Sequence, residues 1–381
     1  MRQFLLERYR LRIFPVLAVV AVIWLVAGAA RDGRRPPAQV TSAQPAAVEP
    51  VVAEVDAFFA SEWQKLPIAP AGSADDLQIL RRLSLALHGT VPSLEEIREF
   101  EADAAPQRLE RWTARLLADH RFGDYFAERL ARGLVGVEGG QFIIFRRDRF
   151  KTWLSEQLQK NTPYDVLVRQ MIAEQGLWTG EPATNFITAA VNEGDFDENK
   201  LAGRSVRAFL GQRIDCAQCH DHPFDDWKQQ DFEGLAAFYG QVRQTIGISD
   251  DAKGEYQVED RKTREQRTIE PGVPFHPEWL PTEGSRRQRL AAWITHADNR
   301  RFERAVANRV WALMFGRAYT EPVDNLPDPS EDGAPDLLDI LGRDFREHGC
   351  DLKRLVQVIA ASKPFRLDSA HPCDDETQFV Q

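Results

Sequence analysis

The stretch Asp75-Asp76-Leu77-Gln78-Ile79-Leu80-Arg81-Arg82-Leu83-Ser84-Leu85-Ala86-Leu87 decides the fold class. Its leucines at positions 77, 80, 83 and 87 recur at the spacing of one face of an amphipathic helix. Gly89-Thr90-Val91-Pro92 then ends this helix. Ser93 begins the next helix, because Glu96 stands three residues later and completes a capping box. The stretch therefore predicts two consecutive helices.

Helical spacing of apolar residues continues over most of the chain from residue 51 onward. The further predicted helices are 51–66, 109–117, 125–134, 150–158, 163–175, 200–212, 231–242, 287–295, 304–315, 337–347 and 352–361. Residues 256–271 instead alternate weakly between apolar and polar, which predicts a small hairpin. The predicted fold is mainly α: a multi-helix globular ectodomain with a small β-hairpin insertion.

The N-terminus predicts the compartment. Arg2, Arg8, Arg10 and Arg12 precede an uncharged run at 13–30, which is just long enough to span a bilayer as a transmembrane helix. The small residues Ala27-Gly28-Ala29 also match a signal-cleavage site, so secretion after cleavage is the alternative. Residues 36–50 are rich in Pro and Ala and predict a linker between this anchor and the ectodomain.

The central motif is Cys216-Ala217-Gln218-Cys219-His220, the spacing that attaches a c-type haem. Cys216 and Cys219 would form the thioethers, and His220 would be the proximal iron ligand. Two other interpretations stay open. Cys216, Cys219, His220 and His222 could hold zinc or iron without porphyrin, with Asp221 and Asp225 accepting hydrogen bonds from the imidazoles. The cysteines could also form a redox disulfide or a purely structural thiol pair.

Candidates for a sixth iron ligand carry less weight. Met171 and Met314 lie on apolar helices, where a core role is favoured. His88, His276 and His296 are the other candidates.

Two further features have structural interpretations. Arg309 lies on an otherwise apolar helix beside Asn308, and we expect Asp324 or Asp339 to pair with it. Cys350 and Cys373 could form a disulfide outside the cytoplasm.

Composition and motif searches limit the remaining functions. The formal net charge of -10 argues against a general nucleic-acid binder. The sequence contains no nucleophile elbow, no zinc-protease helix and no dinucleotide fingerprint, so no catalytic residue is predicted.

Two blocks of sequence resemble a known pair of domains. The first block resembles the planctomycete DUF1549 (cytochrome-c-like) domain. It consists of the motif, the following Gln230-Asp231-Phe232 and Ala237-Phe238-Tyr239, and the upstream segment 83–92. Downstream, Ala305-Val306-Ala307-Asn308-Arg309-Val310-Trp311, Phe315-Gly316-Arg317 and Asp351-Leu352-Lys353-Arg354-Leu355 resemble a shortened DUF1553 domain. The resemblance implies a bacterial protein of the cell surface, of unknown function, whose cytochrome label rests on the same motif.

The predicted organisation combines these parts. Residues 1–35 form a cytoplasmic stub and transmembrane anchor or a signal peptide, 36–50 the linker, 51–245 the DUF1549-like helical domain, 246–281 the hairpin and linker, 282–370 the DUF1553-like helical domain, and 371–381 a tail. The predicted function is a membrane-tethered, extracytoplasmic (periplasmic) c-type haem protein in electron transfer or redox, with an unknown redox partner. The alternatives are a non-haem metal protein and a structural or interaction module of the bacterial surface.

Overall fold

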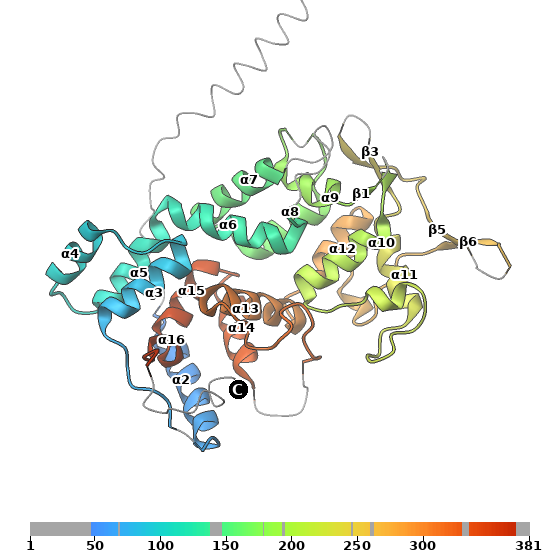
Figure 1. The fold of residues 1–381 in the computed structure, drawn as a ribbon. Coiled ribbons are helices and arrows are strands. Elements are labelled where there is room, and N and C mark those ends of the chain that lie inside the picture. Colours follow the sequence, from blue (N-terminus) through green and yellow to red (C-terminus); the bar gives the residue numbers. More distant parts are fainter. Residues whose placement is uncertain are drawn as a thin grey trace, which may run out of the picture. The chain divides into compact units, whose positions relative to one another are not determined.

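The computed structural model describes residues 47–67, 69–137, 147–177, 179–192, 195–244, 247–259, 263–329 and 335–370. Most of these residues are helical, as predicted (Figure 1). The α-helices are α2 (Glu49–Gln64), α3 (Asp76–His88), α4 (Leu94–Ala102), α5 (Arg108–Ala118), α6 (His120–Val135), α7 (Arg147–Gln159), α8 (Tyr164–Ala173), α9 (Asn185–Thr188), α10 (Glu198–Ser205), α11 (Gln229–Ala237), α12 (Arg286–Ile294), α13 (Arg300–Phe315), α14 (Leu337–Glu347), α15 (Leu352–Ala361) and α16 (Lys363–Arg366).

Shorter helical turns join some of these elements. α10 continues directly into a π-helical turn, η2 (Val206–Leu210), and single 3₁₀ turns are η1 (Pro182–Thr184), η3 (Asp215–Gln218) and η4 (Pro277–Trp279). The predicted helix at 200–212 is therefore an α-helix that changes winding after Ser205.

The local signals around α3 form as the sequence predicts. The Asp75 side chain accepts a hydrogen bond from the backbone N–H of Gln78 at 2.9 Å, and Gly89 ends the helix with a left-handed φ of 71°. Ser93 and Glu96 form the predicted capping box of α4. One prediction on this helix is wrong: Leu77 is exposed, because the first turn of α3 extends beyond the core.

Strands occur as short antiparallel pairs. β5 (Tyr256–Glu259) pairs with β6 (Gln266–Ile269), with Tyr256 opposite Ile269, which confirms the predicted hairpin. The patterns missed two smaller pairs, β1 (Val191–Asn192) with β2 (Asp195–Phe196), and β3 (Val242–Gln244) with β4 (Ile248–Asp250). Strands this short contain too few residues for an alternation pattern.

The described residues, which lie between 47 and 370, form one compact unit whose core includes helices of both predicted helical domains. Helix α13 packs against α3, α14, α15 and the η2 turn. Asn308 is fully buried on α13, and Arg304 is nearly so. No helix among the described residues is long and apolar enough to cross a membrane, and the predicted transmembrane helix at 13–30 lies outside those residues.

Gly234 on α11 provides a test of this packing. A Cβ atom built there would lie 2.9 Å from the carbonyl oxygen of Gly272, in the linker before α12, so backbone must move to admit it. We expect Gly234→Ala to lower the free energy of unfolding by about 1–3 kcal/mol in urea titrations. Gly72→Ala is the matched control, because no heavy atom lies within 4 Å of the added Cβ. Equal effects of the two substitutions would contradict the packing described.

Glu303 on α13 makes stability depend on pH. Its carboxylate lies 3.1 Å from Arg346, yet burial raises the pKa of Glu303 from 4.5 to about 7. Between these values the folded protein holds a proton that the unfolded chain has lost, so the free energy of unfolding falls as pH rises. We expect the free energy of unfolding of Glu303→Gln to fall by up to about 3 kcal/mol less than that of the native chain as pH rises through this range. Urea titrations at a series of pH values measure it, and an unchanged pH slope in the variant would refute the assignment.

Candidate functional site

The Cys-x-x-Cys-His motif forms an exposed loop between the η2 turn and α11. Its first part is the single 3₁₀ turn η3, in which the N–H of Ala217 donates to the carbonyl of Ile214 at 2.9 Å. Ile214 and Ala217 are fully buried and hold the turn against the core. Cys216 and Cys219 consequently face outward, and both are exposed.

His220 is exposed, and its ring is oriented by the next residue. The Nδ1 atom lies 2.6 Å from the backbone carbonyl oxygen of Asp221, an acceptor, so the Nδ1–H donates to it. In the neutral ring this leaves the lone pair on Nε2, the nitrogen that points away from the backbone contact. The geometry therefore leaves one imidazole nitrogen of His220 with a lone pair that is not engaged by the Asp221 carbonyl.

His222 lies in a different environment. Its side chain is only 9% exposed, and its Nδ1 accepts hydrogen bonds from the backbone N–H groups of Phe224 (3.4 Å) and Asp225 (3.0 Å). The backbone N–H of His222 donates to the backbone carbonyl of the buried Trp227 at 2.8 Å. These contacts tie His222 into the turn that closes the loop, whereas the Phe224 ring is 89% exposed at its tip.

The two predicted acceptor aspartates differ. The Asp225 carboxylate lies 3.0 Å from Nδ1 of His222, whereas Asp221 contacts an imidazole through its backbone carbonyl. The Asp221 carboxylate instead accepts from the N–H of Gln229 at the start of α11 (3.0 Å). No group of three or more His, Cys, Asp and Glu side chains in the described part of the chain is arranged to hold a metal ion. A non-haem metal site would therefore require a loop conformation that brings these side chains together.

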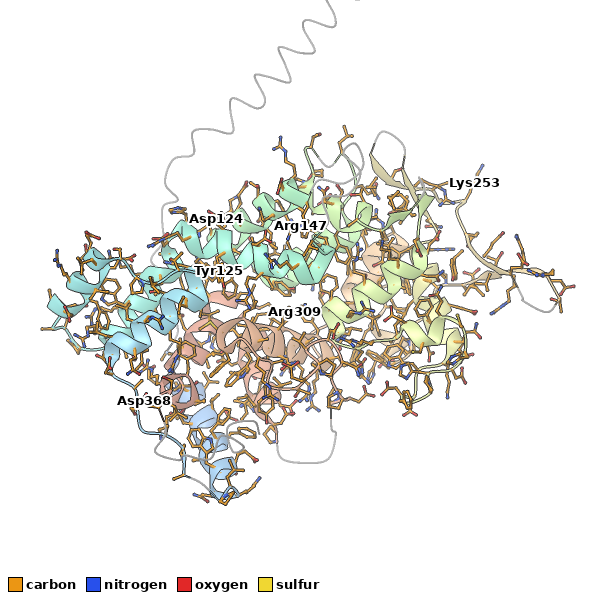
Figure 2. The ribbon with its side chains drawn as sticks, viewed as in Figure 1. Asp124, Tyr125, Arg147, Lys253, Arg309 and Asp368 are labelled. Carbon is orange, nitrogen blue, oxygen red and sulfur yellow. The ribbon has the colours of Figure 1, made fainter. Side chains whose placement is uncertain are left out.

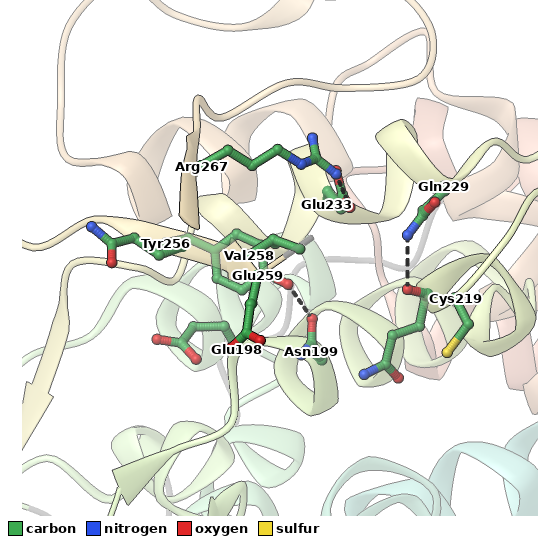
Figure 3. A pocket seen from close by; sticks show the side chains of 11 residues that line it. Glu198, Asn199, Cys219, Gln229, Glu233, Tyr256, Val258, Glu259 and Arg267 are labelled. Atoms are coloured by element: carbon green, nitrogen blue, oxygen red, sulfur yellow. Dashed lines mark hydrogen bonds and ion pairs between the residues drawn. The ribbon is translucent and has the colours of Figure 1, made fainter. Parts of the chain in front are cut away.

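A cavity of about 610 Å³ lies beside Cys219 (Figure 3). Its lining comes from the start of α10, the motif loop, α11 and the β5–β6 hairpin. The lining residues are Glu198, Asn199, Gln218, Cys219, Gln229, Glu233, Tyr256, Gln257, Val258, Glu259 and Arg267. The motif alone gave no indication of this cavity, because the hairpin and α10 approach the loop only in the folded chain.

The chain on the N-terminal side of the motif is held by the segment between α13 and α14. Arg213 donates to Asp324 through Nε (2.9 Å) and Nη2 (2.6 Å), and its backbone N–H donates to Asn325 Oδ1 at 3.1 Å. The N–H of Leu326 donates to the carbonyl of Gly211 at 2.7 Å. The Asp324 carboxylate raises the pKa of Arg213. We call these contacts the Asp324 clamp.

Arg309 also reaches this region, but without the predicted carboxylate. Its Nη2 donates to the backbone carbonyls of Arg207 (3.3 Å) and Ala208 (3.1 Å) in the η2 turn (Figure 2). The expected pairing with Asp324 or Asp339 is wrong, because Arg213 engages Asp324 and Arg304 engages Asp339 at 2.6 Å. The partners of Arg309 are carbonyl oxygens in place of a carboxylate.

The other candidate ligands do not line the cavity beside Cys219. Met171 and Met314 are core residues, as expected. His88 is buried and contacts the carbonyl of Leu116 at 2.9 Å, and burial lowers the pKa of its imidazole. The rings of His276 and His296 each stack on the ring of Trp279, with centroid distances of 4.0 and 4.7 Å.

Cys350 is the one cysteine of the predicted disulfide that the structure describes. It is half-buried, and burial raises the pKa of its thiol to about 12. Cys373 lies outside the described residues, so the pairing stays a prediction.

The fold and the loop define a mainly helical protein with an outward-facing Cys-x-x-Cys-His motif. Residues 54–244 match the family described as Protein of unknown function (DUF1549), and residues 286–379 match Protein of unknown function (DUF1553). The chain therefore belongs to the DUF1549 family and carries a DUF1553 region after it, in the order that the sequence predicted. No curated protein and no solved structure matches the chain.

The Asp324 clamp predicts that the DUF1553 region controls the motif loop. We expect Asp324→Ala to accelerate amide hydrogen exchange in residues 211–222 by about tenfold, since a charged hydrogen-bonded contact contributes about 1.5 kcal/mol. Exchange in α3 should not change. Asp148→Ala, on the exposed surface of α7, is the charge-matched control. Loop exchange that is the same in both variants would show that the clamp does not hold the loop.

Proposed function

We propose that this chain is an extracytoplasmic c-type haem protein that exchanges electrons with a partner. Cys216 and Cys219 would form the two thioethers, and His220 would be the proximal ligand. The observation that carries the proposal is the arrangement of one short turn: both thiols are exposed, and the His220 ring donates from Nδ1 to the carbonyl of Asp221. Haem attachment needs accessible thiols, and ligation needs an imidazole nitrogen that bears a lone pair.

The donor set fits a c-type haem in its chemistry. When bound, such a haem supplies a one-electron redox centre. The chain's own residues orient the proximal imidazole through the Asp221 carbonyl, and anchor the loop through Ile214 and Trp227, which are both buried. Around the motif the surface is polar and open, with the Phe224 ring almost fully exposed. Such surroundings favour electron exchange at the surface over chemistry in an enclosed pocket.

The proposed location follows from the same chemistry. Covalent haem attachment takes place outside the cytoplasmic membrane in bacteria, and the apolar run at 13–30 would tether the ectodomain there. The partners are then the membrane, through this helix, and a redox protein whose identity the motif does not specify.

Two alternatives use the same loop. A non-haem zinc or iron site would use Cys216, Cys219, His220 and His222, and a structural module would use the motif only to stabilise the turn.

Expression of the full chain with a haem-maturation system tests the proposal. We expect a Soret band and a haem stain that stays with the denatured chain. Cys216→Ser combined with Cys219→Ser should abolish the stain, whereas Cys350→Ser should retain it, because Cys350 lies outside the loop. His220→Ala should change the spectrum of any chain that still carries haem.

A colourless chain, produced beside a maturing control cytochrome, would rule out the haem proposal. Metal analysis of that colourless chain separates the alternatives. Stoichiometric zinc or iron that is lost in His222→Ala would establish the metal site, and a metal-free chain would leave the structural role.

A further inference from the structure

The cavity beside Cys219 has a fixed floor. Glu233 is 4% exposed at its side chain, and Nη2 of Arg267 donates to both of its carboxylate oxygens, at 2.6 and 2.7 Å (Figure 3). The buried Tyr256 hydroxyl donates to Oδ1 of Asn199 at 2.6 Å. Burial raises the pKa of Tyr256 to about 12, so this hydroxyl keeps its proton at neutral pH. The floor is therefore organised before any ligand arrives.

The walls offer hydrogen bonds of both kinds. The amides of Gln218, Gln229 and Gln257 each supply N–H donors and a carbonyl acceptor, and the Glu198 and Glu259 carboxylates supply acceptors. A ligand hydroxyl both donates and accepts, so it can use this mixed lining. An apolar ligand would leave these groups without partners, at a cost of about 1–3 kcal/mol for each buried one.

Two of the three carboxylates that line the cavity are paired with arginines. Arg267 neutralises Glu233, and Arg264 lies 2.8 Å from Glu259 at the rim. Among the described residues no group of His, Cys, Asp and Glu is arranged to hold a metal ion. The volume of about 610 Å³ falls within the roughly 300–1,000 Å³ typical of small-molecule sites.

We propose that this cavity binds a small neutral polyhydroxylated molecule, a saccharide of one or two rings. The side chains of Gln229 on α11 and Gln257 on β5 supply contacts to its hydroxyls, and the Tyr256 ring and Val258 supply an apolar surface for its C–H face. The proposal goes beyond the haem function and does not depend on it, since every group involved belongs to the chain.

Saturation-transfer difference NMR on the full-length chain, in detergent without a sugar headgroup, tests this binding. The probes are glucose, maltose, cellobiose and lactose, with spermidine as the cationic comparison. We expect transfer to at least one neutral probe at millimolar concentration. Gln229→Leu and Gln257→Leu should each weaken that binding about fivefold. Gln230→Leu is the matched control, because Gln230 is exposed on the same turn of α11 and does not line the cavity.

Several results would overturn the proposal. The first is that no neutral probe shows saturation transfer. The second is that transfer to a neutral probe is the same in the native chain and in both cavity variants. The third is that only spermidine shows transfer and that Glu259→Gln removes it. Saturation transfer to the native chain tests binding by itself, whether or not the variants fold. Circular dichroism confirms that the variants fold. The assay needs no haem, so a colourless chain that binds a saccharide refutes the haem proposal and supports this one.

Discussion

The burial of α13 is the constraint on which the rest of the structure depends. This helix runs through the core shared by the two family regions, and it carries polar side chains that cannot be buried without partners. Arg304 is held by Asp336 and Asp339, and Asn308 exchanges hydrogen bonds with the backbone of Thr320 at 2.8 and 3.0 Å. These contacts fix the chain that follows α13, because Thr320 belongs to the segment that continues into the Asp324 clamp.

The motif loop thus receives its position from both halves of the chain. On its N-terminal side, η2 packs on α13, Arg309 satisfies carbonyls of η2, and Asp324 holds Arg213. On the C-terminal side, the buried Trp227 closes the turn through the N–H of His222. Between these anchors the two thiols and His220 stay exposed. An exposed loop held by anchors at both ends suits a group that must be reached from solvent.

The cavity beside Cys219 has a polar lining. Its lining of amides and carboxylates contrasts with the apolar surroundings that enclose most cofactors. Gln218 and Cys219 belong both to the motif and to the cavity lining, so a molecule held there would lie beside the proposed redox centre. The hairpin β5–β6 supplies one wall of the cavity, which gives this short insertion a role other than packing.

The sequence by itself determined most of the helices, the capping box at Ser93, the β5–β6 hairpin, the family and the Cys-x-x-Cys-His motif, because these depend on residues that are close together in the chain. Ser93 with Glu96, and Cys216 with His220, are within one or two turns of each other. Only the tertiary structure decided that Arg213 rather than Arg309 engages Asp324, that Nδ1 of His222 lies beside backbone N–H groups and the Asp225 carboxylate, and that Gln229 and Gln257 line one cavity. Those pairings join residues from separate elements or depend on one loop conformation, and many residues in the sequence could have supplied the same charge or hydrogen bond. Geometry selected among them, since each buried polar group takes the partner that packing brings within reach.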